Sequence, residues 1–211
     1  MDAFVPTAIP LALKLGYSAF MAALLPVYLR TYGPTNFLYF CDVALLLTLA
    51  GIWSEDALLL SVATVGILLA QLFWLLDFAV RLVFGRGSGM TDYMFDASRS
   101  RLLRGLSLFH GWLPILLLVL LRHTGYDARA LPVWTALASV LVLVCYFAMP
   151  PPSRERGLKP VNINYVYGFS DETPQRWMPA WAWLGVALVG FPLALYLPGH
   201  LLLRWLMPAA P

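Results

Sequence analysis

The stretch LLRGLSLFHGWLPILLLVLL, residues 102–121, decides the fold, because it is long and apolar enough to cross a bilayer, which takes about 20 residues. It carries one histidine, His110, near its start. A polar ring inside a membrane helix is costly unless it faces protein or water, so such residues commonly mark functional sites. Pro114 has no N–H to bond the His110 carbonyl, so we expect a kink that leaves this carbonyl free. The alternative is a packed histidine above an ordinary proline kink.

The composition extends this membrane assignment to the whole chain. Of its 211 residues, 61% are hydrophobic and 12% are charged, with a mean hydropathy of +0.75; a soluble domain usually has about 25% charged residues. The sequence therefore predicts an all-α, polytopic transmembrane helix bundle that occupies residues 1–211 as one integral membrane domain. The net charge of +3 comes from basic residues beside apolar runs, so no nucleic-acid partner is expected.

Six membrane crossings account for the apolar runs. They are expected at residues 11–29, 36–53, 57–84, 102–121, 131–149 and 179–197. The loops after the first, third and fifth crossings, with their flanks, hold ten of the 14 basic residues, and the opposite side holds four. By the positive-inside rule, these loops are expected in the cytoplasm and both termini outside it. This describes a multi-pass membrane protein, located in the inner membrane if the cell is bacterial.

Four polar side chains within the apolar runs share one expected depth. Cys41 and Asp42 lie seven and eight residues past Pro34, toward the cytoplasmic end of the second crossing. Asp77 lies seven residues before Phe84, and His110 lies six residues past Arg104, again toward the cytoplasmic ends of their crossings. At about 1.5 Å per residue, each lies roughly 10 Å below the cytoplasmic surface. Unrelated polar residues would scatter in depth. The shared layer therefore predicts one polar pocket that opens to the inner leaflet or the cytoplasm.

A thiol, an imidazole and a carboxylate together can catalyse acyl transfer. The histidine removes the thiol proton, the thiolate attacks a carbonyl carbon, and the carboxylate orients the imidazole ring. Asp42 and Asp77 are both candidates for this carboxylate, and Arg81 offers Asp77 a different partner four residues away. One histidine with two aspartates has no recognisable metal-ligand spacing, so neither a metal nor a diffusible cofactor is expected.

Other interpretations of the same residues stay open. A buried cysteine such as Cys41 commonly packs as a small hydrophobic residue, and Cys145 is expected to do so. Asp77 and His110 could instead relay protons in a small proton-coupled transporter. The chain could also be a non-catalytic membrane scaffold, and it could form a homo-oligomer.

The polar segment VNINYVYG, residues 161–168, follows the fifth crossing. It is expected on the same side of the membrane as the layer of polar residues. Asn162, Asn164 and Tyr165 could fold back over the pocket as a lid or polar wall and contact a substrate. The alternative is a tyrosine-rich loop that rests at the lipid headgroups.

Three stretches resemble, in order, the landmarks of a superfamily of six-helix membrane proteins. They are FLYFCDVALLL at residues 37–47, LFHGWLPILLL at residues 108–118 and NINYVYG at residues 162–168. The superfamily includes YwaF-like bacterial membrane proteins, androgen-induced/ADTRP-type lipid hydrolases and a related ether-lipid acyltransferase. The resemblance implies a lipid acyl-ester hydrolase or acyltransferase that acts on membrane lipids, with Cys41 as nucleophile and His110 as base. Bacterial members often have a histidine where this chain has Tyr39.

Overall fold

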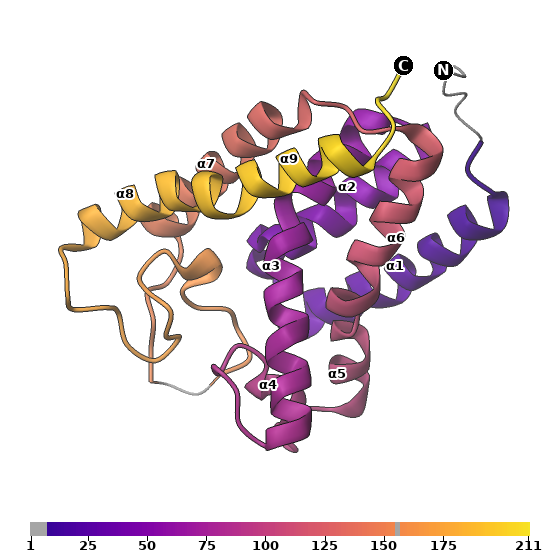
Figure 1. Ribbon diagram of the computed structural model, residues 1–211. Helices are drawn as coiled ribbons and strands as arrows, with labels where there is room; N and C mark the ends of the chain where they lie inside the picture. Colours follow the sequence, from indigo (N-terminus) through magenta and orange to yellow (C-terminus); the bar gives the residue numbers. More distant parts are fainter. Residues whose placement is uncertain (1–7, 155–156) are drawn as a thin grey trace.

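The computed structural model describes residues 8–154 and 157–211, and this part of the chain forms helices and no strand (Figure 1). In chain order the elements are α1 (Leu11–Thr31), η1 (Pro34–Leu38), α2 (Phe40–Ser54), α3 (Ala57–Phe84), α4 (Asp92–Phe95), α5 (Arg101–Ser107), α6 (Phe109–Thr124), α7 (Ala130–Ala148), η2 (Ile163–Tyr165), α8 (Ala180–Phe191), η3 (Pro192–Tyr196) and α9 (Leu197–Leu206). The expected all-α class is confirmed.

Five helical segments of the described chain are long and apolar enough to cross a membrane. They are Leu11–Thr31, Ala57–Phe84, Arg101–Thr124, Ala130–Ala148 and Ala180–Leu206. The last of these combines α8, the π-helical turn η3 and α9. The expected crossing at residues 36–53 is instead divided into η1 and the shorter apolar helix α2, because Tyr39 between them has an extended backbone (φ −63°, ψ 138°).

The long helix α3 is the centre of the bundle, with α2 on one side and α6 on another (Figure 1). A tight turn joins α2 to α3: Glu55 takes the left-handed conformation, and the Asp56 side chain caps α3 by accepting the Leu59 N–H at 3.0 Å. Gly66 of α3 lies so close to Trp134 of α7 that a Cβ at this position would overlap the indole ring. Small residues thus let α3 approach its neighbours closely.

The fourth expected crossing is interrupted at Leu108, six residues before Pro114. α5 ends at Ser107, α6 begins at Phe109, and α6 continues through Pro114. The Gly111 N–H bonds the Leu108 carbonyl at 2.9 Å, whereas a regular α-helix would direct it to the Ser107 carbonyl. The interruption therefore lies more than one turn before the proline at which the kink was expected.

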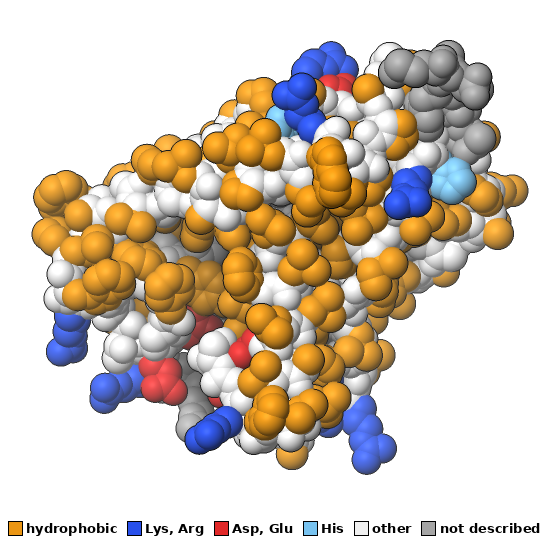
Figure 2. Space-filling model, viewed as in Figure 1, with side chains coloured by type: hydrophobic (Ala, Val, Ile, Leu, Met, Phe, Trp, Pro, Cys, Tyr) orange, Lys and Arg blue, Asp and Glu red, His pale blue; other side chains and the backbone are white. Residues whose placement is uncertain are grey.

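The surface separates into bands that suit a bilayer. Figure 2 shows hydrophobic side chains across the middle of this face, with charged side chains gathered toward its two ends. The start of α1 and the C-terminal end lie at one end of the bundle, and α4 and the connection between α7 and α8 lie toward the other (Figure 1). Large apolar side chains such as Phe73, Phe147 and Trp181 are exposed on the helices. The chain is therefore a multi-pass integral membrane protein.

Candidate active site

His110 is held by its own helix at the interruption between α5 and α6. Its Nδ1 lies 2.8 Å from the Ser107 carbonyl oxygen, the acceptor that the Gly111 N–H leaves free. A carbonyl oxygen can only accept, so Nδ1 carries the proton and Nε2 keeps a lone pair. Within residues 8–154 and 157–211, no hydrogen bond to Nε2 is formed. The half-buried imidazole thus has the tautomer that a general base requires.

An indole and a phenol extend the site beyond this histidine. The Trp74 ring stacks on His110 with ring centroids 5.0 Å apart and an interplanar angle of 18°, and its Nε1 donates a hydrogen bond to the Tyr93 phenol oxygen at 3.1 Å. Burial raises the pKa of the Tyr93 phenol, the Trp74 hydrogen bond lowers it, and the nearby Cys41 raises it. Burial has the largest effect, so Tyr93 stays protonated and retains a hydrogen to donate.

Sequence reasoning missed both Trp74 and Tyr93. In the sequence, Trp74 is one more apolar residue of a predicted membrane helix, and Tyr93 lies in a predicted loop that has no regular hydrophobic pattern. No local signal distinguishes either residue, because their roles come from contacts with segments that are distant in the sequence.

The Asp77 carboxylate holds the loop that leads to Tyr93. It accepts hydrogen bonds from the Ser88 N–H at 2.5 Å, the Thr91 N–H at 2.9 Å and the Thr91 hydroxyl at 2.6 Å. In the described part of the chain, no hydrogen bond or ion pair joins Asp77 to His110. Asp77 therefore anchors the loop to α3, and its hydrogen bonds within the described residues go to this loop and not to the imidazole that it was expected to orient.

The expected partner of Asp77 is also engaged elsewhere. Arg81 lies 3.5 Å from the carboxylate of Asp92, at the start of α4, and its guanidinium lies 5.7 Å from the centre of the Phe95 ring. Both contacts hold α4 against α3. The arginine thus supports the position of α4 together with Asp77.

Cys41 and Asp42 lie in the first turn of α2. Cys41 is half-buried and Asp42 is 3% exposed. The Asn36 amide donates to Asp42 Oδ2 at 2.9 Å, and Asp42 Oδ1 is buried without a hydrogen-bond partner among the described residues.

The structure places Cys41 and His110 close in depth, with an offset of about one turn. Gly51 of α2 lies against Leu60 of α3, so in this antiparallel pair Cys41 is level with position 70. The stacked rings of His110 and Trp74 lie at the same level. The four residues from position 70 to Trp74 correspond to about 6 Å along the axis of α3. No hydrogen bond joins Cys41 to His110 within the described ranges. Proton transfer between them requires a bridging water or a side-chain movement.

Asn164 fastens the loop after α7 to the start of α2. Its Oδ1 accepts the Phe40 N–H at 3.1 Å, and its Nδ2 donates to the Leu38 carbonyl at 2.9 Å and to Cys145 Sγ at 3.6 Å. The amide thus satisfies the two backbone groups on either side of the break at Tyr39. Cys145 is fully buried in this contact.

Asn162 and Tyr165 shape the same loop. Asn162 Oδ1 accepts the Tyr167 N–H at 2.8 Å, and its Nδ2 donates to the Gly168 carbonyl at 2.7 Å. Asn162, Asn164 and Tyr165 all have positive φ angles, of 48°, 58° and 58°. Burial, followed by the charge of Asp171 and then Cys41, raises the pKa of Tyr165 to about 12. The three expected substrate-binding residues thus form one strained segment beside the first turn of α2.

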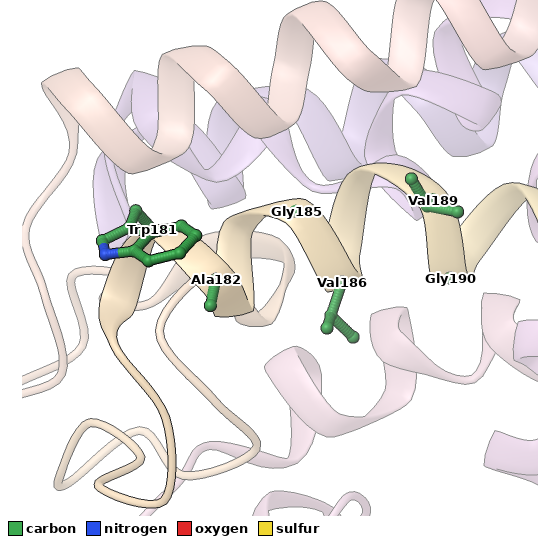
Figure 3. Close-up of a pocket in the computed structure, with 6 residues that line it drawn as sticks. All are labelled: Trp181, Ala182, Gly185, Val186, Val189 and Gly190. Atoms are coloured by element: carbon green, nitrogen blue, oxygen red, sulfur yellow. The ribbon is translucent and has the colours of Figure 1, made fainter.

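An apolar depression lies on α8, outside this constellation. It is lined by Trp181, Ala182, Gly185, Val186, Val189 and Gly190 (Figure 3). Its lining includes no titratable side chain and suits contact with lipid chains. Within the described residues, no group of three or more His, Cys, Asp and Glu side chains is arranged to hold a metal ion.

Comparison with known proteins identifies no relative of this chain. No family model, no curated protein and no solved structure matches it. The fold therefore defines the class, a multi-pass membrane protein, and the side chains around His110 and Cys41 are the basis for a proposed activity.

Proposed function

We propose that this protein is a membrane-embedded lipid acyl-ester hydrolase or acyltransferase, with Cys41 as nucleophile and His110 as general base. The observation that carries the proposal is the 2.8 Å hydrogen bond between His110 Nδ1 and the Ser107 carbonyl. It directs the proton to Nδ1, fixes the ring orientation and leaves Nε2 able to accept a proton. In hydrolases of this kind, a base oriented in this way activates the nucleophile.

The reaction proceeds in two balanced steps. Through a bridging water, or after a side-chain movement that brings the two groups together, His110 Nε2 takes the proton of the Cys41 thiol. Sγ forms a bond to the ester carbonyl carbon while the bond from that carbon to the alcohol oxygen breaks. The proton passes to the departing alcohol, which leaves a thioester on Cys41. Water, or the hydroxyl of a second lipid, then attacks the thioester carbon and loses its proton to His110. The thiol is restored, and the fatty acid or new ester departs.

The surroundings favour a lipid substrate at the inner leaflet. Cys41 lies at the start of the apolar helix α2 and His110 at the start of the apolar helix α6. α6 follows directly on α5, whose sequence RLLRGLS contains two arginines. A long acyl chain can reach this depth from the bilayer, whereas a charged soluble substrate would lose its hydration. No observation favours the transporter alternative, because the Asp77 carboxylate is engaged by Ser88 and Thr91.

An acyl-transfer probe tests this proposal directly. The purified protein in lipid nanodiscs is incubated with p-nitrophenyl decanoate, and intact-protein mass spectrometry follows the acyl adduct. We expect one adduct on Cys41, none on Cys41→Ala, and acylation slowed by about 100-fold or more in His110→Ala, because general-base assistance is commonly worth that much.

Cys145→Ala is the matched control, because Cys145 is a buried thiol that contacts the Asn164 amide and has no histidine partner within the described residues. Its acylation rate should equal that of the unaltered protein. An adduct on Cys145, or acylation of Cys41 that does not depend on His110, would contradict the proposed mechanism.

A further inference from the structure

Gln71 in the middle of α3 is a buried polar side chain that the proposed mechanism does not use. It is 2% exposed, and neither its Oε1 nor its Nε2 has a hydrogen-bond partner in the described part of the chain. Other buried polar side chains of α3 are satisfied; the Thr64 hydroxyl, for example, bonds the Leu60 carbonyl at 2.7 Å. A carboxamide without partners in an apolar interior is unfavourable, so an external hydrogen-bonding group is the natural partner for Gln71.

The direction of Gln71 follows from the turn of the helix. Leu60 faces Gly51 of α2, and Leu75 faces Gly111 of α6. At about 100° per residue, Gln71 projects about 20° from the direction of Leu60 and about 40° from that of Leu75. Its carboxamide is therefore directed into the seam between α2 and α6, the two helices that carry Cys41 and His110.

The depth of Gln71 matches this seam. The contact of Gly51 with Leu60 places Gln71 opposite Phe40, the residue before Cys41. On the other side, the contact of Leu75 with Gly111 places Gln71 near the level of Pro114, one turn beyond His110. Gln71 thus lies at the depth of the nucleophile and one turn from the base.

We infer that Gln71 binds the carbonyl oxygen of the lipid acyl ester through its Nε2–H group. Because this role rests on the function proposed above, it concerns the same reaction. When Cys41 attacks, the carbonyl oxygen gains an electron pair and becomes an oxyanion, and the Nε2–H bond to it strengthens. The electron pair returns to the carbon when the alcohol leaves. A neutral donor suits this position, because a charged donor would be costly to bury in the membrane.

Gln71→Leu tests this role because it keeps the approximate volume and removes both polar atoms. Thr64→Val is the matched control: Thr64 is fully buried on nearly the same face of α3, two turns away, and its hydroxyl is satisfied within the helix. Acylation of Cys41 by p-nitrophenyl decanoate is measured for both variants at several probe concentrations. We expect the maximal rate to fall by about 100-fold or more in Gln71→Leu, as for other losses of an oxyanion donor, and to remain unchanged in Thr64→Val.

Two further measurements separate this role from a structural one. The melting temperature of Gln71→Leu should equal or exceed that of the unaltered protein, because an unpartnered amide is replaced by an apolar group. Infrared spectroscopy of the thioester formed from ¹³C-carbonyl-labelled probe should show a higher carbonyl stretching frequency in Gln71→Leu, since the hydrogen bond to the oxygen is lost.

The outcomes distinguish this inference from the proposed function. Normal acylation and an unshifted carbonyl band in Gln71→Leu would overturn the role of Gln71 and leave Cys41 and His110 in place. A melting temperature that falls along with the rate would show that Gln71 supports the fold, which also overturns the inference. An unaltered protein that forms no adduct on Cys41 would overturn the proposed function and this role together.

Discussion

The side-chain oxygen of Asn164 accepts the backbone N–H of Phe40 at 3.1 Å, so a loop that follows α7 fixes the first turn of the helix that carries Cys41. The same amide donates to the Leu38 carbonyl at 2.9 Å. The break between η1 and α2 would otherwise leave both backbone groups unpaired in a part-buried position. Asn164 therefore serves as the helix cap that Tyr39 does not supply.

Replacement of this amide should destabilise the protein. In Asn164→Ala, Phe40 N–H and the Leu38 carbonyl lose their partner, which should lower the free energy of unfolding by about 1–3 kcal/mol. Thermal unfolding in detergent micelles measures the change. Ser139→Ala is the control, because the Ser139 hydroxyl donates to the Thr135 carbonyl of its own helix. Equal stability of the two variants would show that the cap has no energetic role.

The Asp77 carboxylate should control the order of the loop between α3 and α4. Asp77→Asn replaces one acceptor oxygen with an NH₂ group that faces the donors of Ser88 and Thr91. We expect faster hydrogen–deuterium exchange across residues 86–95, because the loop loses its attachment to α3. Asp127→Asn is the control, since the Asp127 carboxylate bonds Arg129 in the connection between α6 and α7 and does not contact residues 86–95 in the described part of the chain. Unchanged exchange in Asp77→Asn would refute the anchoring role.

The tautomer of His110 can be observed directly. The 2.8 Å contact with the Ser107 carbonyl predicts that the neutral ring carries its proton on Nδ1. ¹⁵N NMR of the histidine-labelled protein in nanodiscs should show a protonated Nδ1 and an unprotonated Nε2 for this ring. His110→Gln identifies the signal by its loss. A ring protonated on Nε2 would remove the structural basis for His110 as the base.

The contact between Gly66 and Trp134 should limit the size of the side chain at position 66. A methyl group there overlaps the indole, so Gly66→Ala should lower the free energy of unfolding by about 1–3 kcal/mol through overpacking. Gly16→Ala in α1 is the matched control, because no atom lies within 4 Å of a Cβ at that position. Thermal unfolding compares the two. A stable Gly66→Ala with a destabilised Gly16→Ala would contradict the packing of α3 on α7.

Helical class and membrane location could be predicted from the apolar runs alone. Backbone groups in a bilayer must bond within their own segment, so long apolar runs such as residues 57–84 and 131–149 become helices whatever surrounds them. The division at residues 36–53 could not be predicted in the same way, because Asn164 supplies the partners for the broken backbone. At the interruption near Leu108, the His110 ring bonds the Ser107 carbonyl that the helix leaves free, and the apolar pattern of this stretch does not indicate this contact.

The candidate site was also predictable only in part from the sequence. A polar residue in an apolar run is visible in any sequence, and this signal identified Cys41 and His110 as candidates. The sequence by itself determined which side chains are unusual for a membrane helix, because hydropathy is a local property. Only the tertiary structure decided that Asp77 holds a loop and that Gln71 has no hydrogen-bond partner in the described part of the chain, because a hydrogen bond depends on which distant segments pack together.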